Sequence, residues 1–210
     1  MVKNDLKDDR PSTGGYADRS PEGIADRSGP PETAAAQRIA QAWAVLATVP
    51  DPEVPAVSVC DLGIVRDVFA LDDGGDDDGG GGLEIVLTPT YSGCPATEAI
   101  ASDVVTAIDA AGLGPARVSL RRAPAWTSDW ISAAGRTKML AHGIVPPGPA
   151  RADGGVAMVF IGRGQSAPRL ACPRCGSANT ERLAAFGSTA CKATYRCRAC
   201  GEPFEHFKAI

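Results

Sequence analysis

The stretch CPRCGSANTERLAAFGSTACKATYRCRAC (172–200) decides the architecture of the C-terminal part of the chain. Two intervening residues let both sulfurs of a Cys-x-x-Cys pair face one point, so two such pairs can supply four thiolates in a tetrahedron. The 21 residues between the pairs leave room for a strand hairpin through 181–197. The pattern therefore predicts a small metal-binding domain over residues 170–210, whose ligands are Cys172, Cys175, Cys197 and Cys200.

The predicted metal is structural. Four thiolates in a closed site favour zinc, although iron also accepts this set. Because about forty residues bury too little apolar surface to fold alone, the metal must contribute folding free energy. With four protein ligands the metal has no open position for substrate. We interpret Cys191 as a small core residue of the hairpin, with a redox or substitute-ligand role as the alternative, and His206 could replace a ligand although four cysteines already suffice.

Outside this tail, composition divides the chain into three segments. Residues 1–32 are polar and lack hydrophobic periodicity, so we expect a disordered extension. Residues 33–148 carry the patterns of a small α/β domain. Residues 149–169 read as a linker that begins within IVPPGPARADGG (144–155), with an additional strand over 156–162. The tract DDGGDDDGGGG (72–82) is predicted to be a loop, because its acids do not follow the spacing of a calcium loop.

The predicted elements of residues 33–148 follow the order helix–strand–strand–helix–strand–helix, which indicates an α+β fold or small α/β layer. Apolar residues every third or fourth position predict the helices, and β-branched runs predict the strands. Tryptophans 126 and 130 are interpreted as core or interface residues, and His142 as a helix C-terminal cap. The expected helices cover 33–49, 95–111 and 128–143, and the strands lie within 57–71, 83–88 and 117–123.

Composition and charge narrow the functional classes. A chain with 44% hydrophobic and 22% charged residues is typical of a soluble globular protein. The sequence contains no run of eighteen apolar residues, so no membrane span is expected. The N-terminus has no apolar segment typical of a signal peptide, so we expect a cytoplasmic protein. The body is acidic whereas the tail is basic. A nucleic-acid-binding ribbon is therefore a weaker alternative, resting on Arg174, Arg182, Lys192, Arg196 and Arg198.

Cys94 is the residue of the body most suited to chemistry. It stands between Gly93 and Pro95, where the second helix should begin, and proline is favoured at the first helical position. At a helix N-cap, free amide groups and the helix dipole lower the pKa of a thiol and make it nucleophilic and metal-binding. The alternative is a buried cysteine that acts as a small hydrophobe. Gly93 favours the first interpretation, because it allows close approach of the backbone.

Other stretches border the same predicted pocket. Candidate pocket residues are Asp51 and Glu53 after the first helix, and Thr90 and Ser92 beside Cys94. The stretch Cys60-Asp61-Leu62-Gly63 precedes the first strand. For both acidic stretches, ordinary turn chemistry is the alternative, since Asp, Pro and Gly favour turns. No Ser/His/Asp arrangement and no phosphate-binding loop is present in the sequence, so catalysis by this chain alone is not expected.

The stretches DPEVPAVSVCDLGIV (51–65) and TPTYSGCPATEAI (88–100) resemble the SufT-like iron–sulfur assembly family. Members carry a reactive cysteine before a helix, which Cys94 matches, and an acidic stretch that residues 51–53 match. Together with the cysteine-rich tail, PAWTSDWISAAGRTKMLAHGIVPP (124–147) is similar to the PaaD/PaaJ branch, which serves a bacterial phenylacetyl-CoA ring epoxidase. Cys60 has no counterpart in this pattern.

The resemblance implies an accessory subunit in phenylacetate degradation that helps assemble an iron–sulfur cluster in a partner. Cys94 would hold iron or a cluster transiently, and the iron–sulfur reductase subunit is the expected partner, with a homodimer as a further expectation. A scaffolding subunit without metal delivery is the alternative. The resemblance implies a SufT-like α/β domain followed by a zinc ribbon.

Overall fold

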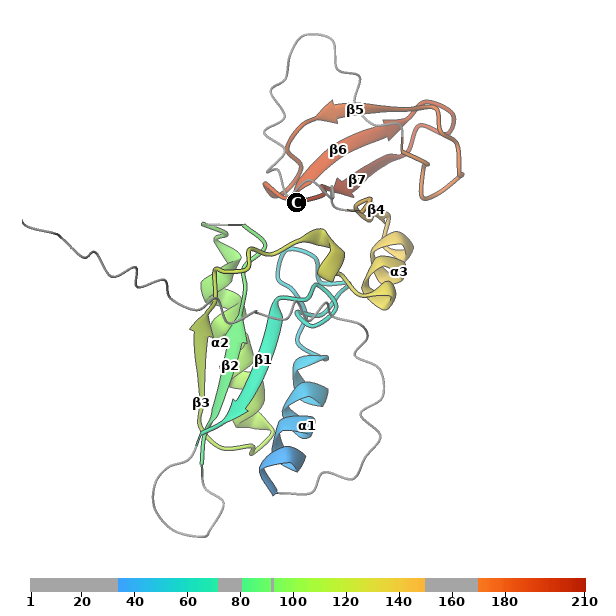
Figure 1. The fold of residues 1–210 in the computed structure, drawn as a ribbon. Helices are drawn as coiled ribbons and strands as arrows, with labels where there is room; N and C mark the ends of the chain where they lie inside the picture. The colour runs from blue at the N-terminus through green and yellow to red at the C-terminus, as the bar shows by residue number, and fades with distance from the viewer. Residues whose placement is uncertain (1–33, 72–80, 92, 150–169) are drawn as a thin grey trace, which may run out of the picture.

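A computed structural model describes residues 34–71, 81–91, 93–149 and 170–210 of the 210-residue chain. Four expectations lie outside these ranges: the N-terminal extension 1–32, the strand over 156–162, most of the Asp/Gly tract and the pocket residue Ser92. The described residues form two sheets, one of three strands and one of four (Figure 1). The fold is thus α+β, with the four-cysteine region in the second sheet.

The first sheet contains β1 (Val65–Ala70), β2 (Leu83–Leu87) and β3 (Ala116–Leu120). Strands β1 and β2 are adjacent and antiparallel. Strand β3 runs parallel to β2, because helix α2 (Ala96–Ala110) returns the chain to the same end of the sheet. Helix α1 (Ala34–Leu46) packs beside α2, and both lie on the same side of the sheet (Figure 1).

The core of the body lies between these helices and the sheet. Residues four apart in α2 form one buried face, and alternate residues of β2 face it. The opposite side of the sheet carries ion pairs, with Arg117 to Glu84 at 2.9 Å and Arg121 to Asp67 at 2.6 Å. The sheet therefore has one dry face and one polar face. The buried residues between the helices and the dry face of the sheet include Ala42, Leu46, Leu83, Ile85, Leu87, Ile100, Val104 and Ile108.

The single helix predicted over 128–143 is wrong. The structure has a short 3₁₀ helix, η1 (Ser128–Trp130), and then a separate helix, α3 (Ala133–Ala141). The break occurs at Ser132, whose hydroxyl accepts a hydrogen bond from the amide of Gly135 at 2.9 Å and so caps a new helix. His142 is the C-cap of α3, as predicted.

The interpretation of IVPPGPARADGG (144–155) as a linker is wrong at its first two residues. Strand β4 (Ile144–Val145) pairs in parallel with β7 (Pro203–Phe207) and extends the second sheet. Its remaining strands, β5 (Thr180–Ala184) and β6 (Lys192–Cys197), form the predicted hairpin, and the strand order is β4-β7-β6-β5. Two residues that precede the linker thus belong to the sheet that follows it.

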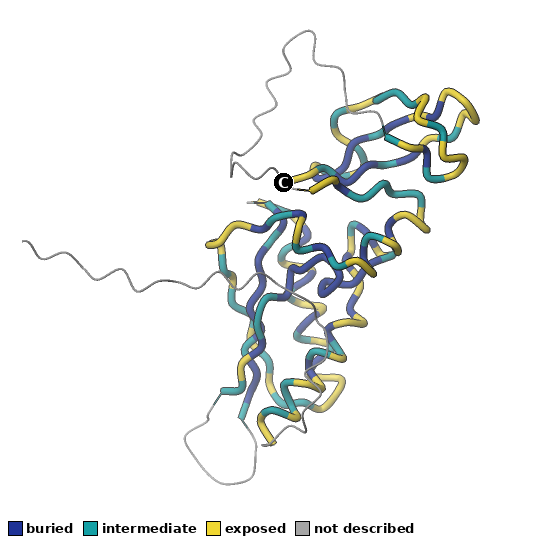
Figure 2. The backbone as a smooth tube through the Cα atoms, turned by 45° about the vertical axis from the view of Figure 1, so that its right-hand side comes forward, coloured by how far each residue is buried: buried dark blue, intermediate teal, exposed yellow. Residues whose placement is uncertain are grey.

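The ribbon, residues 170–210, packs directly on the body. Cys191 and Phe207 are buried with the core of the body rather than with the ribbon's own core. Figure 2 shows buried segments, drawn dark blue, in both the body and the ribbon. The Phe207 ring lies 6.1 Å from that of Trp126, centroid to centroid. The amide of Ser128 donates to the carbonyl oxygen of Ile210 at 3.1 Å. Trp126 is therefore both a core and an interface residue, in agreement with its predicted role.

Candidate metal centre and thiol pocket

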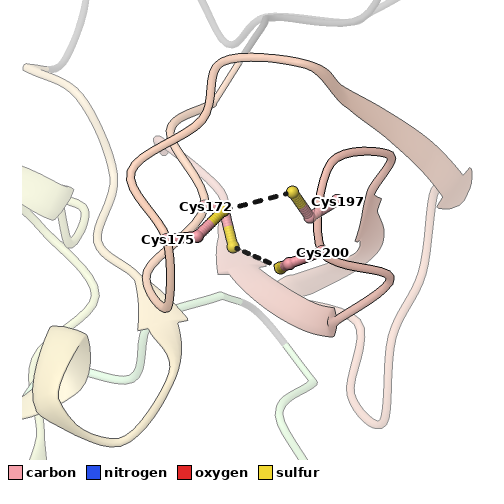
Figure 3. Close-up of side chains that lie close together, drawn as sticks. All are labelled: Cys172, Cys175, Cys197 and Cys200. Atoms are coloured by element: carbon pink, nitrogen blue, oxygen red, sulfur yellow. Dashed lines mark hydrogen bonds between the residues drawn. The ribbon is translucent and has the colours of Figure 1, made fainter.

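The four cysteines of the ribbon point toward one another (Figure 3). Their sulfur atoms all lie within 4.8 Å of each other. The distance is 3.8 Å between the sulfurs of Cys172 and Cys200, and 3.6 Å between those of Cys175 and Cys197. Each of these contacts joins a cysteine of one Cys-x-x-Cys turn, or knuckle, to a cysteine of the other knuckle, as a single tetrahedrally coordinated ion requires.

Local backbone geometry builds both knuckles in the same way. Gly176 and Gly201 each follow the second cysteine of a pair, at φ angles of 73° and 80° that favour glycine. Each glycine amide donates to the carbonyl of the first cysteine of its pair, Cys172 or Cys197, at 2.9 Å. The amides of Cys200 and Ala199 lower the pKa of Cys197 to about 7. These turns therefore place the sulfurs and favour a thiolate at Cys197. The bond from the Ser177 backbone lowers the pKa of Cys175, but hydrogen bonds with Cys200 and Cys197 outweigh it and raise this pKa to about 12.

The chemistry of the donor set fits structural zinc. Four thiolates are available within one small volume, which leaves no open position, and two of them belong to the buried residues Cys172 and Cys197. His206 does not join the set, because its Nδ1 lies 3.1 Å from the carbonyl oxygen of Val145 and its ring lies edge-on to Tyr195. When bound, zinc would crosslink the two knuckles and stabilise this domain.

Cys94 lies one residue farther from α2 than the sequence predicted. The N-cap is Pro95, and the structure shows no side-chain capping bond there, so the predicted N-cap position of Cys94 is wrong. Proline adopts the helical φ already at the cap, which moves the cysteine out into the preceding turn. The side chain is half-buried. Gly93 before it has a φ of 88° and open space around its Cα, consistent with an accessible loop.

Cys94 lines a small cavity where the body meets the ribbon. The room for the centre of a water molecule is about 20 Å³, so the cavity holds roughly one water. The structure brings three of the four predicted pocket residues to this cavity, whereas Ser92 lies outside the described residues. Residues around the cavity include Asp51, Glu53, Thr90, Cys94, Cys191 and Phe207.

The two acids of the cavity have different roles. Asp51 is buried, and its Oδ1 accepts the amides of Glu53 at 2.9 Å and Val54 at 2.8 Å. Burial raises the pKa of Asp51, and these amide bonds oppose that rise. Asp51 therefore serves the turn, in line with the turn alternative. The Glu53 carboxylate instead faces the ribbon, with Oε2 3.6 Å from the sulfur of Cys191.

The sequence does not indicate two residues that bear on this pocket, one that lines it and one that lies beside Cys94. Cys191, expected to be a core residue of the hairpin, is buried against the body and borders the cavity. The Tyr91 carbonyl accepts a hydrogen bond from the Cys94 amide at 3.3 Å, and burial, then Cys94, Glu53 and Cys191, raise the pKa of the Tyr91 phenol to about 12. No local pattern could indicate Cys191, because only the packing of the ribbon on the body brings it to Cys94.

Residues 60–63 have structural roles. Burial raises the pKa of Cys60 to about 12, and this residue does not border the cavity. Asp61 accepts bonds from Lys138 at 2.6 Å and from Ser132 at 3.1 Å, which ties this turn to α3. The turn interpretation therefore accounts for the contacts of these residues.

Two family models match the chain. Residues 39–120 match the iron–sulfur cluster assembly protein family, and residues 159–208 match the PaaD zinc beta ribbon domain. A crystal structure of a domain of unknown function from Bacillus anthracis is 27% identical, covers 49% of this chain and 92% of its own, and has a TM-score of 0.42. A Mycobacterium tuberculosis protein, described as associated with iron–sulfur complex assembly and repair, is 30% identical over 55% of this chain and 95% of its own, with a TM-score of 0.31.

Within the described residues, no helix is both long enough and apolar enough to cross a membrane. A curated relative from Escherichia coli (strain K12), named as a subunit of a "Putative 1,2-phenylacetyl-CoA epoxidase", is 40% identical over 178 residues. The match covers 85% of this chain and 97% of that relative. It thus spans both the assembly domain and the ribbon, and the chain belongs to the PaaD family of phenylacetyl-CoA epoxidase subunits.

Proposed function

We propose that this chain is an accessory subunit of a phenylacetyl-CoA epoxidase that assists assembly of an iron–sulfur cluster in a partner subunit. Cys94 would hold iron or a cluster transiently, and the iron–sulfur reductase is the expected client. A homodimer is compatible with this role. The observation that carries the proposal is the position of Cys94, half-buried beside a cavity that an acidic stretch also borders.

The surroundings of Cys94 support transient binding rather than permanent storage. The thiol is half-exposed, so a partner protein can reach it, whereas the ribbon cysteines form a closed set. A metal held by few protein ligands exchanges more readily than one held by four. The ribbon therefore suits a structural role, and Cys94 suits delivery.

The test is the variant Cys94→Ser, coexpressed with the oxygenase components. We expect the variant to fold and keep its ribbon zinc, and the purified client to contain little iron and sulfide and have low epoxidase activity. The matched control is Cys60→Ala, which removes a buried thiol of the same domain that does not border the cavity. If the client coexpressed with Cys94→Ser contains its full complement of iron and sulfide, delivery by this thiol is contradicted and the scaffolding alternative is left.

The charges of the ribbon weaken the nucleic-acid alternative. Arg174 pairs with Glu202, and Arg196 and Arg198 both pair with Glu181. Lys192 is buried and lies 3.0 Å from Glu205. Phosphate binding needs uncompensated cations, and four of the five basic residues considered already contact carboxylates. Salt-dependent binding of the full chain to DNA or RNA would revive this alternative.

A further inference from the structure

Two thiols that are far apart in the sequence, Cys94 and Cys191, border one cavity. Cys94 precedes α2 of the body, and Cys191 precedes β6 of the ribbon. The Glu53 carboxylate lies between the two domains, with Oε2 3.6 Å from the sulfur of Cys191. Sulfur and carboxylate oxygen are both ligands of divalent transition metals. The cavity thus combines two thiols and one carboxylate.

The contacts of Cys191 place its side chain firmly. It is 4% exposed, and its sulfur lies 3.0 Å from the hydroxyl of Thr189. Lys192, the next residue, donates to the Glu53 backbone carbonyl at 3.1 Å and fastens this corner of the ribbon to the body. A buried thiol fixed beside a carboxylate is more than a small hydrophobe, because apolar packing alone would not need the carboxylate.

Tyr91 connects Cys94 to the same group of residues. Its carbonyl accepts the Cys94 amide at 3.3 Å, and the pKa of its phenol is raised to about 12 by burial and then by Cys94, Glu53 and Cys191. A phenol beside two thiols and a carboxylate can donate to a metal-bound thiolate. Such a hydrogen bond orients the ligand and stabilises its charged form.

The size of the cavity limits what it can hold. Its room of about 20 Å³ corresponds to one water-sized particle. One ion that replaces the thiol protons fits this space, whereas a cluster of several irons and sulfides needs several times that volume. The protein would have to open at the contact between body and ribbon to admit a cluster.

We propose that Cys94, Cys191 and Glu53 together bind one divalent iron ion at this contact. The inference rests on the proposed function and names its cargo as a single ion rather than a formed cluster. On binding, each S–H bond breaks and each sulfur forms a bond to iron. The two protons pass to solvent, and iron remains divalent, so no oxidant or reductant is needed.

Ion binding must draw these ligands together. Among the described residues, the four ribbon cysteines alone form a group of three or more Cys, His, Asp or Glu ligand atoms within 4.8 Å. Cys94, on a loop after Gly93, and the Glu53 side chain therefore move toward Cys191 when the ion enters. This movement tightens the ribbon on the body, and its reversal releases the ion.

The test uses anaerobic, full-length protein whose ribbon is already loaded with zinc. Co²⁺ serves as the optical probe and Fe²⁺ as the competitor, because Co²⁺ does not readily displace Zn²⁺ from four thiolates. We expect one Co²⁺ per chain, with thiolate-to-metal charge-transfer absorption that an excess of Fe²⁺ reverses, since Fe²⁺ binds such ligands more weakly than Co²⁺. Cys94→Ser and Cys191→Ser should each weaken binding by about tenfold or more, and Glu53→Gln less, while Cys60→Ala binds like wild type. Zinc content and far-UV circular dichroism check that each variant folds.

The outcomes separate this inference from the proposed function. Wild-type binding by both Cys191→Ser and Glu53→Gln would overturn the shared site and leave delivery by Cys94 intact. If each thiol variant fails to bind Co²⁺ while the client coexpressed with Cys94→Ser still contains its full cluster, the shared site is supported and the delivery role is contradicted. Absence of any Co²⁺ signal in wild-type protein would overturn the site.

Discussion

At the residue scale, Asp61 shows how one carboxylate can connect separate segments. Its side chain is 11% exposed and accepts bonds from Lys138, Ser132 and the amide of Ser58, the last at 3.1 Å. Burial alone would raise its pKa, but the bond from Lys138 and those from Ser58 and Ser132 outweigh burial and lower it below 3.8. The fold therefore favours the charged form.

We predict that Asp61→Asn lowers the free energy of unfolding by about 1–3 kcal/mol at neutral pH, because it leaves buried partners with weaker bonds. The pKa of Asp61 is lower in the folded state than its ordinary value of 3.8. The contribution of this carboxylate to stability is therefore fully present above pH 3.8 and is lost as the pH falls through the folded-state pKa. In urea unfolding, the gap between variant and wild type should stay constant from about pH 7 to 5 and close only in stronger acid.

The matched control for Asp61 is Glu84→Gln, which breaks an exposed pair with Arg117 and should change stability little. A gap that already narrows between about pH 7 and 5 would mean that the folded pKa of Asp61 is raised, and would contradict the prediction.

At the element scale, β7 carries the main apolar contact between ribbon and body. We predict that Phe207→Ala weakens this contact by about 3 kcal/mol or more, because Phe207 is 1% exposed and packs on Trp126. The ribbon should still bind zinc, since its own core contains Tyr195 and Phe204. Hydrogen exchange should rise in β7 and around η1.

Phe186→Ala is the control for Phe207, because Phe186 belongs to the same ribbon and is 66% exposed. Equal protection of η1 in wild type and Phe207→Ala would show that the Trp126 contact does not hold the ribbon in place. Loss of zinc from the variant would instead show that the ribbon needs the body in order to fold.

The elements also show where sequence reasoning succeeds. The α2 face and the β1–β2 hairpin were predictable, because their signals repeat within a few residues. The break before α3 depends on one capping bond at Ser132, which a helical pattern can hide. Strand β4 depends on pairing with β7, about sixty residues later, so its two residues carried no local signal.

At the scale of the whole molecule, the same distinction applies to the two sites. The ribbon cysteines could be predicted from spacing, because each knuckle is a local turn. The pocket around Cys94 was only partly predictable: Asp51, Glu53 and Thr90 lie nearby in the structure, but Cys191 arrives through docking of the ribbon. Because zinc folds the ribbon, and the folded ribbon carries Cys191 to the cavity beside Cys94, zinc at one site would provide a ligand for the other.

This dependence gives a prediction for metal removal. Chelation of the ribbon zinc should unfold β5–β7 and expose Cys191, whereas α1 and α2 stay folded on their own sheet. Alkylation followed by mass spectrometry should then modify Cys191 and the four ribbon cysteines, while Cys60 remains protected in the body core. Co²⁺ added after chelation should no longer give the signal of the Cys94 cavity once the ribbon is kept metal-free.

Two results of the chelation experiment would contradict this dependence. Protection of Cys191 after zinc loss would mean that Phe207 and Lys192 hold the ribbon on the body without metal. Modification of Cys60 would mean that the body also unfolds, so that ribbon docking stabilises the whole protein. The proposed order, in which zinc folds the ribbon and the ribbon completes the iron site, requires that Cys191 and Cys60 respond differently to the chelator.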